Sequence, residues 1–199
     1  MNVNDFVTKA LAYEQRPTLY KLGTYMNRKN GKYILCDCSG LIKGILWGYP
    51  DKGRYASNGV PDVNANSIMN EYCTGVTSDM SKLRKGMAVW MSGHIGIYCG
   101  DGIVVESSPR WENGIQRTYP KGCPIYNKHK LNTRQWSKCG YLKWIDYNTT
   151  TDLTTDLNKV ARDVINGKYG NGKERIDKLT KEGYNYKEVQ RVVNSLLKK

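Results

Sequence analysis

The chain has 199 residues, which suits one medium-sized domain or a domain with a small module, and 39% of them are hydrophobic. Its formal net charge of +13 predicts attraction to a polyanion: nucleic acid, an anionic membrane surface or an anionic bacterial wall. Residues 1–17 lack the basic segment and apolar run of a secretory signal, and no segment is long and apolar enough to span a bilayer, so we expect synthesis in the cytoplasm without membrane insertion.

The first three quarters of the chain mix helical and strand patterns. Apolar residues recur on one side of a helix at residues 2–15, and again in SGLIKGILWG at 39–48. A strand is predicted at 86–91, and a hairpin at 93–108, where two β-rich segments flank Gly-Asp-Gly. Residues 109–145 are rich in Trp, Tyr, Gly and Pro, which predicts loops and short strands. The fold class expected is α+β, with helices packed on an antiparallel sheet.

The last quarter is a different kind of sequence. The Thr- and Asp-rich residues 148–155 have no apolar period and are predicted to form a linker. Residues 156–199 contain three segments with helical spacing, which predict a small three-helix bundle. The predicted division is therefore a domain at 1–147, the linker, and the helical module.

Two cysteines precede the second predicted helix, in the stretch CDCSGLIKG. A thiol becomes a better nucleophile at a helix N-terminus or beside an imidazolium, because both favour the thiolate. Cys38 falls in the first turn of the helix, whereas Cys36 falls in extended chain before it. The alternative is that both are small buried hydrophobic residues. Reduced thiols are expected for all six cysteines, given the absence of a secretory signal.

The two histidines of the chain are His94 and His129. His129 is flanked by lysines and is expected in solvent. For the hairpin, a three-residue connection pairs Cys99 with Ile103 and puts His94 and Glu106 on the same face of the sheet. The carboxylate could then accept the Nδ1–H of the imidazole and leave Nε2 for a thiol. A two-residue Asp-Gly turn would put Glu106 on the opposite face.

The segments DCSGLIKGILWG (37–48) and GHIGIYCGDGIVVESSP (93–109) together resemble the NlpC-type papain-like cell-wall peptidases, including those of phage endolysins. The resemblance spans about residues 5–147 and implies a papain-like fold that needs no cofactor. Its pattern is Asp-Cys-Ser-Gly at a helix start, a histidine in a strand, and a polar residue twelve positions after the histidine.

Carried over residue by residue, the resemblance makes Cys38 the nucleophile, His94 the general base and Glu106 the residue that orients the imidazole. The family often has histidine at the third position, so the glutamate is a departure. The family also places a tyrosine near the oxyanion, and the nearest match lies one position off. The resemblance thus implies three substrate-binding residues: Tyr25, Asp37 and Ser39.

The implied reaction is cleavage of a peptidoglycan amide through a thioacyl-enzyme, either in a stem peptide or cross-bridge or at the muramoyl–L-alanine bond. A zinc site is the competing interpretation, because suitable ligand types are present. The spacing Cys-x-Cys lacks the usual two-residue gap, and no second cysteine pair answers it, so no metal is predicted. The four ligands of that alternative would be Cys36, Cys38, His94 and Cys99.

Residues 160–197 are similar to the Cpl-seven wall-binding repeat of phage lysozymes in the DVI-GK-aromatic-GNG turn, in GY before the third helix and in VQ…VN. This resemblance implies binding to the muropeptide part of peptidoglycan without dependence on choline. The predicted contact residues lie at the two interhelical turns: Lys168, Tyr169, Asn171, Arg175 and Tyr184. The alternative is that the two tyrosines pack the bundle while the arginine is solvated.

The protein is therefore predicted to be a peptidoglycan hydrolase of the endolysin type that acts on the wall after release from the infected bacterium. A bacterial lysin exported by another route is a second origin. Anionic wall polymers are the expected partners of its basic surface, and tethering to the wall would raise its effective concentration there. The alternatives are a catalytically inactive wall-binding protein and a nucleic-acid-binding protein. The second is disfavoured because acidic residues are spread over all three predicted C-terminal helices.

Overall fold

The computed structural model describes residues 1–51, 57–147, 150–182, 184 and 186–197, without the side chains of 150–156, 181 and 188. The chain divides into two compact units, Met1–Tyr147 and Asn148–Lys199. Both helices and strands are present, so the fold is of the mixed α+β class. Among the described residues, no helix is long and apolar enough to cross a membrane.

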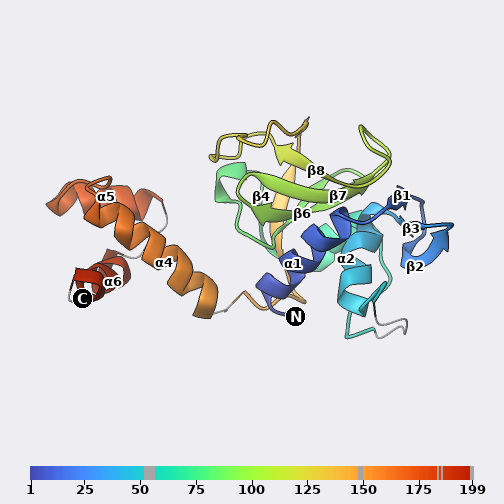
Figure 1. Cartoon of the computed structure of the whole chain (residues 1–199), viewed down its shortest axis with the longest axis horizontal. Helices are drawn as coiled ribbons and strands as arrows, with labels where there is room; N and C mark the ends of the chain where they lie inside the picture. The colour runs from blue at the N-terminus through green and yellow to red at the C-terminus, as the bar shows by residue number, and fades with distance from the viewer. Residues whose placement is uncertain (52–56, 148–149, 183, 185, 198–199) are drawn as a thin grey trace. The chain divides into compact units, whose positions relative to one another are not determined.

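The first unit contains three α-helices, a 3₁₀ turn and ten strands within its described residues (Figure 1). The helices are α1 (Val3–Glu14), α2 (Cys38–Trp47) and α3 (Ala65–Glu71), and the 3₁₀ turn is Met80–Lys82. The strands are β1 (Thr18–Tyr20), β2 (Tyr25–Asn30), β3 (Tyr33–Cys36), β4 (Cys73–Thr77), β5 (Ala88–Met91), β6 (His94–Gly100), β7 (Ile103–Ser108), β8 (Gly114–Pro120), β9 (Thr133–Arg134) and β10 (Lys138–Leu142).

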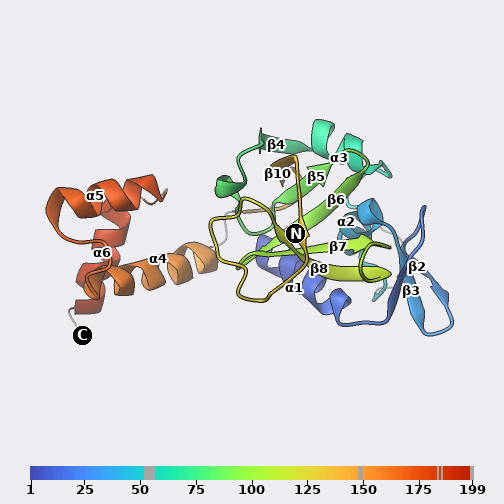
Figure 2. The same ribbon diagram turned by 90° about the horizontal axis from the view of Figure 1, so that it is seen from above.

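The main sheet has the strand order β4-β10-β5-β6-β7-β8-β9. Its neighbours are antiparallel except for β8 and β9, which run parallel. A small second sheet has the order β1-β3-β2. Helices α1 and α2 pack against the central strands β6 and β7 (Figures 1 and 2). The antiparallel sheet expected from the sequence is thus present, and its parallel edge was not foreseen.

The two faces of the main sheet carry separate apolar clusters, because side chains alternate along each strand. Ile95 and Ile97 of β6 join the cluster that includes α1 and α2. Tyr98 of the same strand joins a second cluster, to which Trp136 also belongs. By the same alternation, His94 lies on the face of Tyr98, opposite the helices.

The predicted hairpin at 93–108 is present, but its turn differs from the expected one. Gly100, not Cys99, pairs with Ile103, so the connection has two residues rather than three. Asp101 and Gly102 both have positive φ, 55° and 73°, as a tight Asp-Gly turn requires. The register then shifts at Cys99, and this bulge restores the facing that the longer connection would have given. The histidine and the glutamate of the hairpin therefore share a face.

Helix α2 is buried over its whole length and begins at Cys38. Asp37 caps it, because its Oδ1 accepts a hydrogen bond of 2.6 Å from the backbone N–H of Gly40. The helix also lies very close to the chain that leads into β2. A Cβ on Gly40 would stand 2.0 Å from the carbonyl oxygen of Thr24. Glycine at this position thus lets the first turn of α2 approach that backbone.

The second unit contains three helices: α4 (Thr150–Ile165), α5 (Gly172–Lys181) and α6 (Tyr186–Leu197). Their shared core consists of Val160, Ala161, Val164, Tyr169, Leu179, Val189 and Val193. The prediction of a linker at 148–155 is wrong for residues 150–155, which form the start of α4, and residues 148–149 lie outside the described residues. A leucine at 153 stands four residues before one at 157, and this helical spacing outweighs the threonines around it.

Candidate functional site

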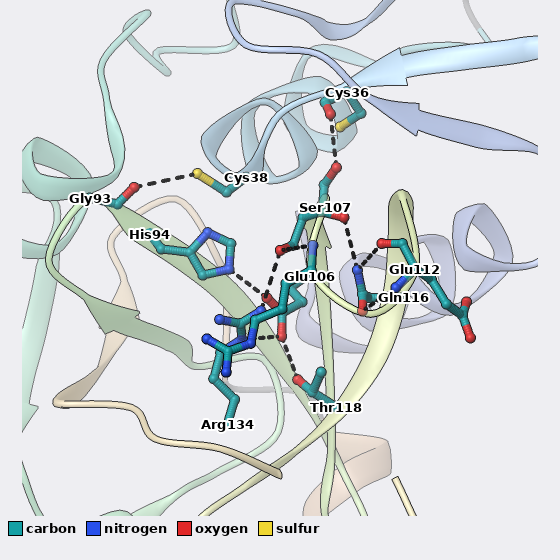
Figure 3. Close-up of polar contacts among 12 residues, drawn as sticks. Cys36, Cys38, Gly93, His94, Glu106, Ser107, Glu112, Gln116, Thr118 and Arg134 are labelled. Carbon is teal, nitrogen blue, oxygen red and sulfur yellow. Dashed lines mark hydrogen bonds and ion pairs between the residues drawn. The ribbon is translucent and has the colours of Figure 1, made fainter. Parts of the chain in front are cut away.

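Cys38 is the first residue of α2, as predicted, and lies near the start of the central strand β6 (Figure 3). Its Sγ is 3.9 Å from the carbonyl oxygen of Gly93, the residue before β6, and 6% of the residue is exposed. Free N–H groups of a first helical turn favour negative charge there. The helix start thus delivers this sulfur to the beginning of the strand that carries His94.

His94 and Glu106 contact each other across β6 and β7. The Nε2 atom of His94 is 2.5 Å from Oε2 of Glu106. The other ring nitrogen, Nδ1, lies on the side of Cys38 (Figure 3). The prediction that Nδ1 would bind the carboxylate and Nε2 the thiol is therefore wrong. The buried carboxylate lies on the side of the imidazole away from Cys38, and Nε2 is the nitrogen on that side (Figure 3).

Glu106 is completely buried, yet its carboxylate is fully engaged. Besides His94, its Oε1 accepts hydrogen bonds from Thr118 Oγ1 at 2.6 Å and from Arg134 Nε at 2.7 Å. A buried carboxylate tolerates its charge only when it is paired and hydrogen-bonded in this way. The arrangement holds Glu106 in one orientation beneath the imidazole.

The pKa values of the two groups shift in opposite directions. Burial alone would lower the pKa of His94, but its contacts with Cys38 and Glu106 raise it to about 9. Burial alone would raise the pKa of Glu106, but the hydrogen bonds from His94 and Thr118 and the charges of His94 and Arg134 hold it below its usual value. At neutral pH the pair is therefore an imidazolium beside a carboxylate.

A stack of aromatic rings and cations continues from the imidazole. The ring of Trp136 lies parallel to that of His94, with an interplanar angle of 11° and centroids 5.4 Å apart. The guanidinium of Arg134 lies 5.6 Å from the Trp136 ring and 4.7 Å from the Trp111 ring. Sequence reasoning missed all three, because they follow no motif: Trp111 and Trp136 lie outside the strands, and Arg134 belongs to the two-residue strand β9. The cluster of Trp with Arg in the TRQW stretch was the one available signal.

Asp37 and Ser39 flank the sulfur but point into the fold. Besides capping α2, Asp37 accepts a hydrogen bond of 2.8 Å from Gly23 N–H with Oδ2 and one of 3.0 Å from Ser39 Oγ with Oδ1. Both side chains are buried. The hydrogen bonds of Asp37 and Ser39 thus hold the loop before β2 against the start of α2, and in this way they position Cys38.

Tyr25 lies away from the sulfur. Its ring packs edge-on against Trp47, with centroids 4.8 Å apart, at the end of α2 opposite Cys38. Cys38 and Trp47 are nine positions apart in the helix, a rise of about 13.5 Å. Tyr20 lies in the electrostatic surroundings of the site instead: burial raises its pKa, and the charges of Cys38 and Asp37 raise it further. The structure therefore does not bring the predicted Tyr25 beside Cys38.

The remaining thiols offer a contrast with Cys38. All six cysteines are free and buried. Burial raises the pKa of the Cys36 thiol well above its usual range, so Cys36 is a neutral thiol. The zinc alternative needed Cys36, Cys38, His94 and Cys99 to converge. In the described part of the chain, no group of three or more His, Cys, Asp or Glu side chains has the geometry of a metal site.

The predicted contact residues of the second unit divide into two kinds. Tyr169 is 3% exposed and packs in the core, with its hydroxyl donating to Glu182 at 2.6 Å, so the prediction that it forms a surface is wrong. Its large ring packs between the helices and supplies apolar contact area that so small a core needs. Tyr184 is half-buried against the same core. Lys168 is exposed and pairs with an aspartate of α4.

Asn171 and Arg175 lie together at the start of α5. Arg175 Nη2 donates to Asn171 Oδ1 at 2.8 Å, and its Nη1 donates to Gln190 Oε1 at 3.2 Å. Arg175 Nε donates to the carbonyl oxygen of Gly170 at 3.1 Å. Asn171 stands at the N-cap position of α5 but makes no side-chain cap bond.

Residues 158–197 match the CW_7 repeat. The matched segment begins within α4 and includes the whole of α5 and α6. The second unit therefore carries a repeat that supports association with the cell wall. No curated protein matches the chain.

Proposed function

We propose that the first unit hydrolyses an amide bond of bacterial peptidoglycan and that the CW_7 repeat holds it on the wall, as in an endolysin. The observation that carries the proposal is the alignment of three groups: Cys38 at a helix start, an imidazole that turns Nδ1 toward it, and a buried carboxylate on Nε2. A thiol, a base and a residue that orients the base are the parts that nucleophilic acyl transfer requires.

In the proposed reaction the Cys38 thiolate attacks the amide carbonyl, and the C–S bond forms as the π electrons move to oxygen. The oxyanion is held by N–H groups at the start of α2. As the intermediate collapses, the C–N bond breaks and His94 gives the proton on Nδ1 to the leaving amine. Water then attacks the thioester carbonyl while His94 takes a proton from the water. The C–S bond breaks, which releases the carboxylic acid and restores the Cys38 thiolate. Glu106 keeps Nε2 protonated and the ring in place throughout.

Loss of turbidity of heat-treated Gram-positive cells tests the proposal. Cys38→Ala should abolish clearing, whereas Cys36→Ala should retain it, because the Cys36 thiol is buried and neutral. Mass spectrometry of the digested wall should show a new amine and a new carboxylate at the cleaved amide, and the fragments that carry them identify the bond. Clearing that persists undiminished in Cys38→Ala would contradict the mechanism, and the absence of clearing on every wall type would favour a protein that only binds.

Wall binding by the second unit can be tested separately with the full-length Cys38→Ala protein, which should bind walls without dissolving them. We propose that Asn171 and Arg175 contribute to the contact, because both offer polar groups at the surface of the repeat. Arg175→Ala should reduce the fraction that pellets with purified walls. Lys143→Ala, which changes an exposed lysine of the first unit, is the control of equal charge. Equal pelleting of both variants would reject the proposed contact.

A further inference from the structure

Arg134 makes the most deeply buried ion pair of the described residues. Its side chain is 7% exposed and that of Glu106 is 0% exposed, and Nε stands 2.7 Å from Oε1. Its Nη2 also donates to Ser108 Oγ at 3.3 Å. Burial of a guanidinium costs free energy unless its charge is paired and its N–H groups are hydrogen-bonded. Here the partner is the residue that orients the imidazole.

The same guanidinium lies against the rings of Trp111 and Trp136, and the second of these stacks on His94. Arg134 therefore reaches the imidazole by two routes, through the carboxylate and through the indole. The planar fork of arginine suits both contacts, because it can donate in its plane while its face packs on a ring. A lysine would supply the charge without the plane.

We propose that Arg134 is a positioning residue of the hydrolytic site: it keeps Glu106 ionised and aligned, so that His94 presents Nδ1 to Cys38. The expected effect on turnover rests on the proposed function, whereas the effect of Arg134 on the charge and orientation of Glu106 does not. Nothing in the pattern of the sequence assigns this role, because the third residue of the motif is already Glu106.

The charges around the pair determine the direction of the effect. Glu106 in β7 faces His94 from β6 and Arg134 from β9, with the Thr118 hydroxyl from β8, while Cys38 of α2 faces the other side of the imidazole. Arg134 and the imidazolium share one carboxylate. Removal of the guanidinium takes away a positive charge, so both His94 and Glu106 should bind protons more tightly.

The test is a titration of the His94 ring by NMR in histidine-labelled protein, with His129→Gln to assign the two histidines. In Arg134→Met the titration of His94 should move to higher pH, and in Arg134→Lys it should stay near that of the wild type. Arg117→Met is the matched control. It removes an arginine of β8 that pairs with Glu14 of α1, and it should leave the titration of His94 unchanged.

Turnover of a soluble muropeptide gives the second reading. Because lysine lacks the planar fork, Arg134→Lys should lower kcat on the order of 10-fold or more with little change in KM. Thermal melts establish which variants are folded. If Arg134→Met does not fold, Arg134→Lys decides alone: wild-type kcat in that variant overturns the proposal.

An unchanged His94 titration in folded Arg134→Met also overturns it. The two proposals fail separately, because the titration needs no substrate. A wild-type protein that cleaves no wall, but whose His94 shifts in Arg134→Met, would refute the function and leave the electrostatic coupling standing. An active wild type without that shift would refute the coupling alone.

Discussion

At the scale of single residues, the candidate site depends on the carboxylate of Glu106, at a position where a histidine could also accept a hydrogen bond from the imidazole. A neutral histidine could accept one hydrogen bond, whereas the Glu106 carboxylate accepts from His94, Thr118 and Arg134 at once. The negative charge has a second consequence, since it stabilises the imidazolium and moves the titration of His94 upward. The carboxylate of Glu106 thus couples His94 to the buried Arg134.

The raised pKa of His94 predicts how stability depends on pH. The folded pKa of about 9 exceeds the ordinary value of 6.5, so the folded state binds the proton more tightly than the unfolded state. This contribution to the free energy of unfolding is fully present below pH 6.5 and is lost as the pH rises through about 9. Urea unfolding across this range should show the decline in the wild type.

The control for that measurement is His94→Gln, which should show a smaller decline over the same range, while His129→Gln should behave like the wild type. Equal slopes for wild type and His94→Gln would mean that the imidazole carries no raised pKa. Cysteine alkylation followed over the same pH range reports on the site itself.

At the scale of secondary-structure elements, the position of the sulfur depends on how closely α2 approaches the chain before β2. Asp37 ties Gly23 to the helix start, and Gly40 leaves room for Thr24. The contact is with a backbone oxygen, so no side chain can rotate to relieve a clash. Cys38 is thus positioned by a packed backbone rather than by its own contacts.

Gly40→Ala should therefore displace the first turn of α2. Overpacking of a core typically costs about 1–3 kcal/mol, and a backbone clash should reach the upper part of that range. The expected result is a lower denaturation midpoint and strongly reduced wall clearing. Thr8→Ala, at an exposed position of α1, is the control and should change neither. Wild-type stability in Gly40→Ala would show that the loop yields easily.

The hairpin shows what the sequence could and could not predict. The pattern HIGIYCG-DG-IVVES located both strands, and the facing of His94 and Glu106 followed from one assumed turn. The structure reaches that facing by a tighter turn and a bulge at Cys99, which no local pattern specifies. Which ring nitrogen meets the carboxylate depends on how the two side chains pack, and Arg134 comes from β9, a two-residue strand 28 residues after Glu106. Such features depend on tertiary packing, so short-range periodicity does not contain them.

At the scale of the whole molecule, two units with separate cores divide the work proposed for the chain. The first unit carries every group of the candidate site, and the second carries the CW_7 repeat. Residues 156–199 hold eleven lysines and arginines against six acidic residues, a net +5, so the second unit also adds to the attraction for anionic polymers. Binding and cleavage should therefore be separable by truncation.

A protein ending at Tyr147 should fold, because both clusters of the main sheet lie within it. Its kcat and KM on a soluble muropeptide should match those of the full chain. On insoluble walls its rate at low enzyme concentration should fall by on the order of 10-fold or more, since tethering no longer raises the local concentration. Equal rates on walls would show that the repeat contributes nothing to cleavage there.

The division into units has an optical consequence. All five tryptophans precede residue 147, so indole emission comes from the first unit alone. The second unit is helical in its described residues and contributes chiefly to far-ultraviolet circular dichroism. Melting followed by both signals on one sample should thus reveal two transitions whenever the units unfold independently, without any label or dissection of the chain.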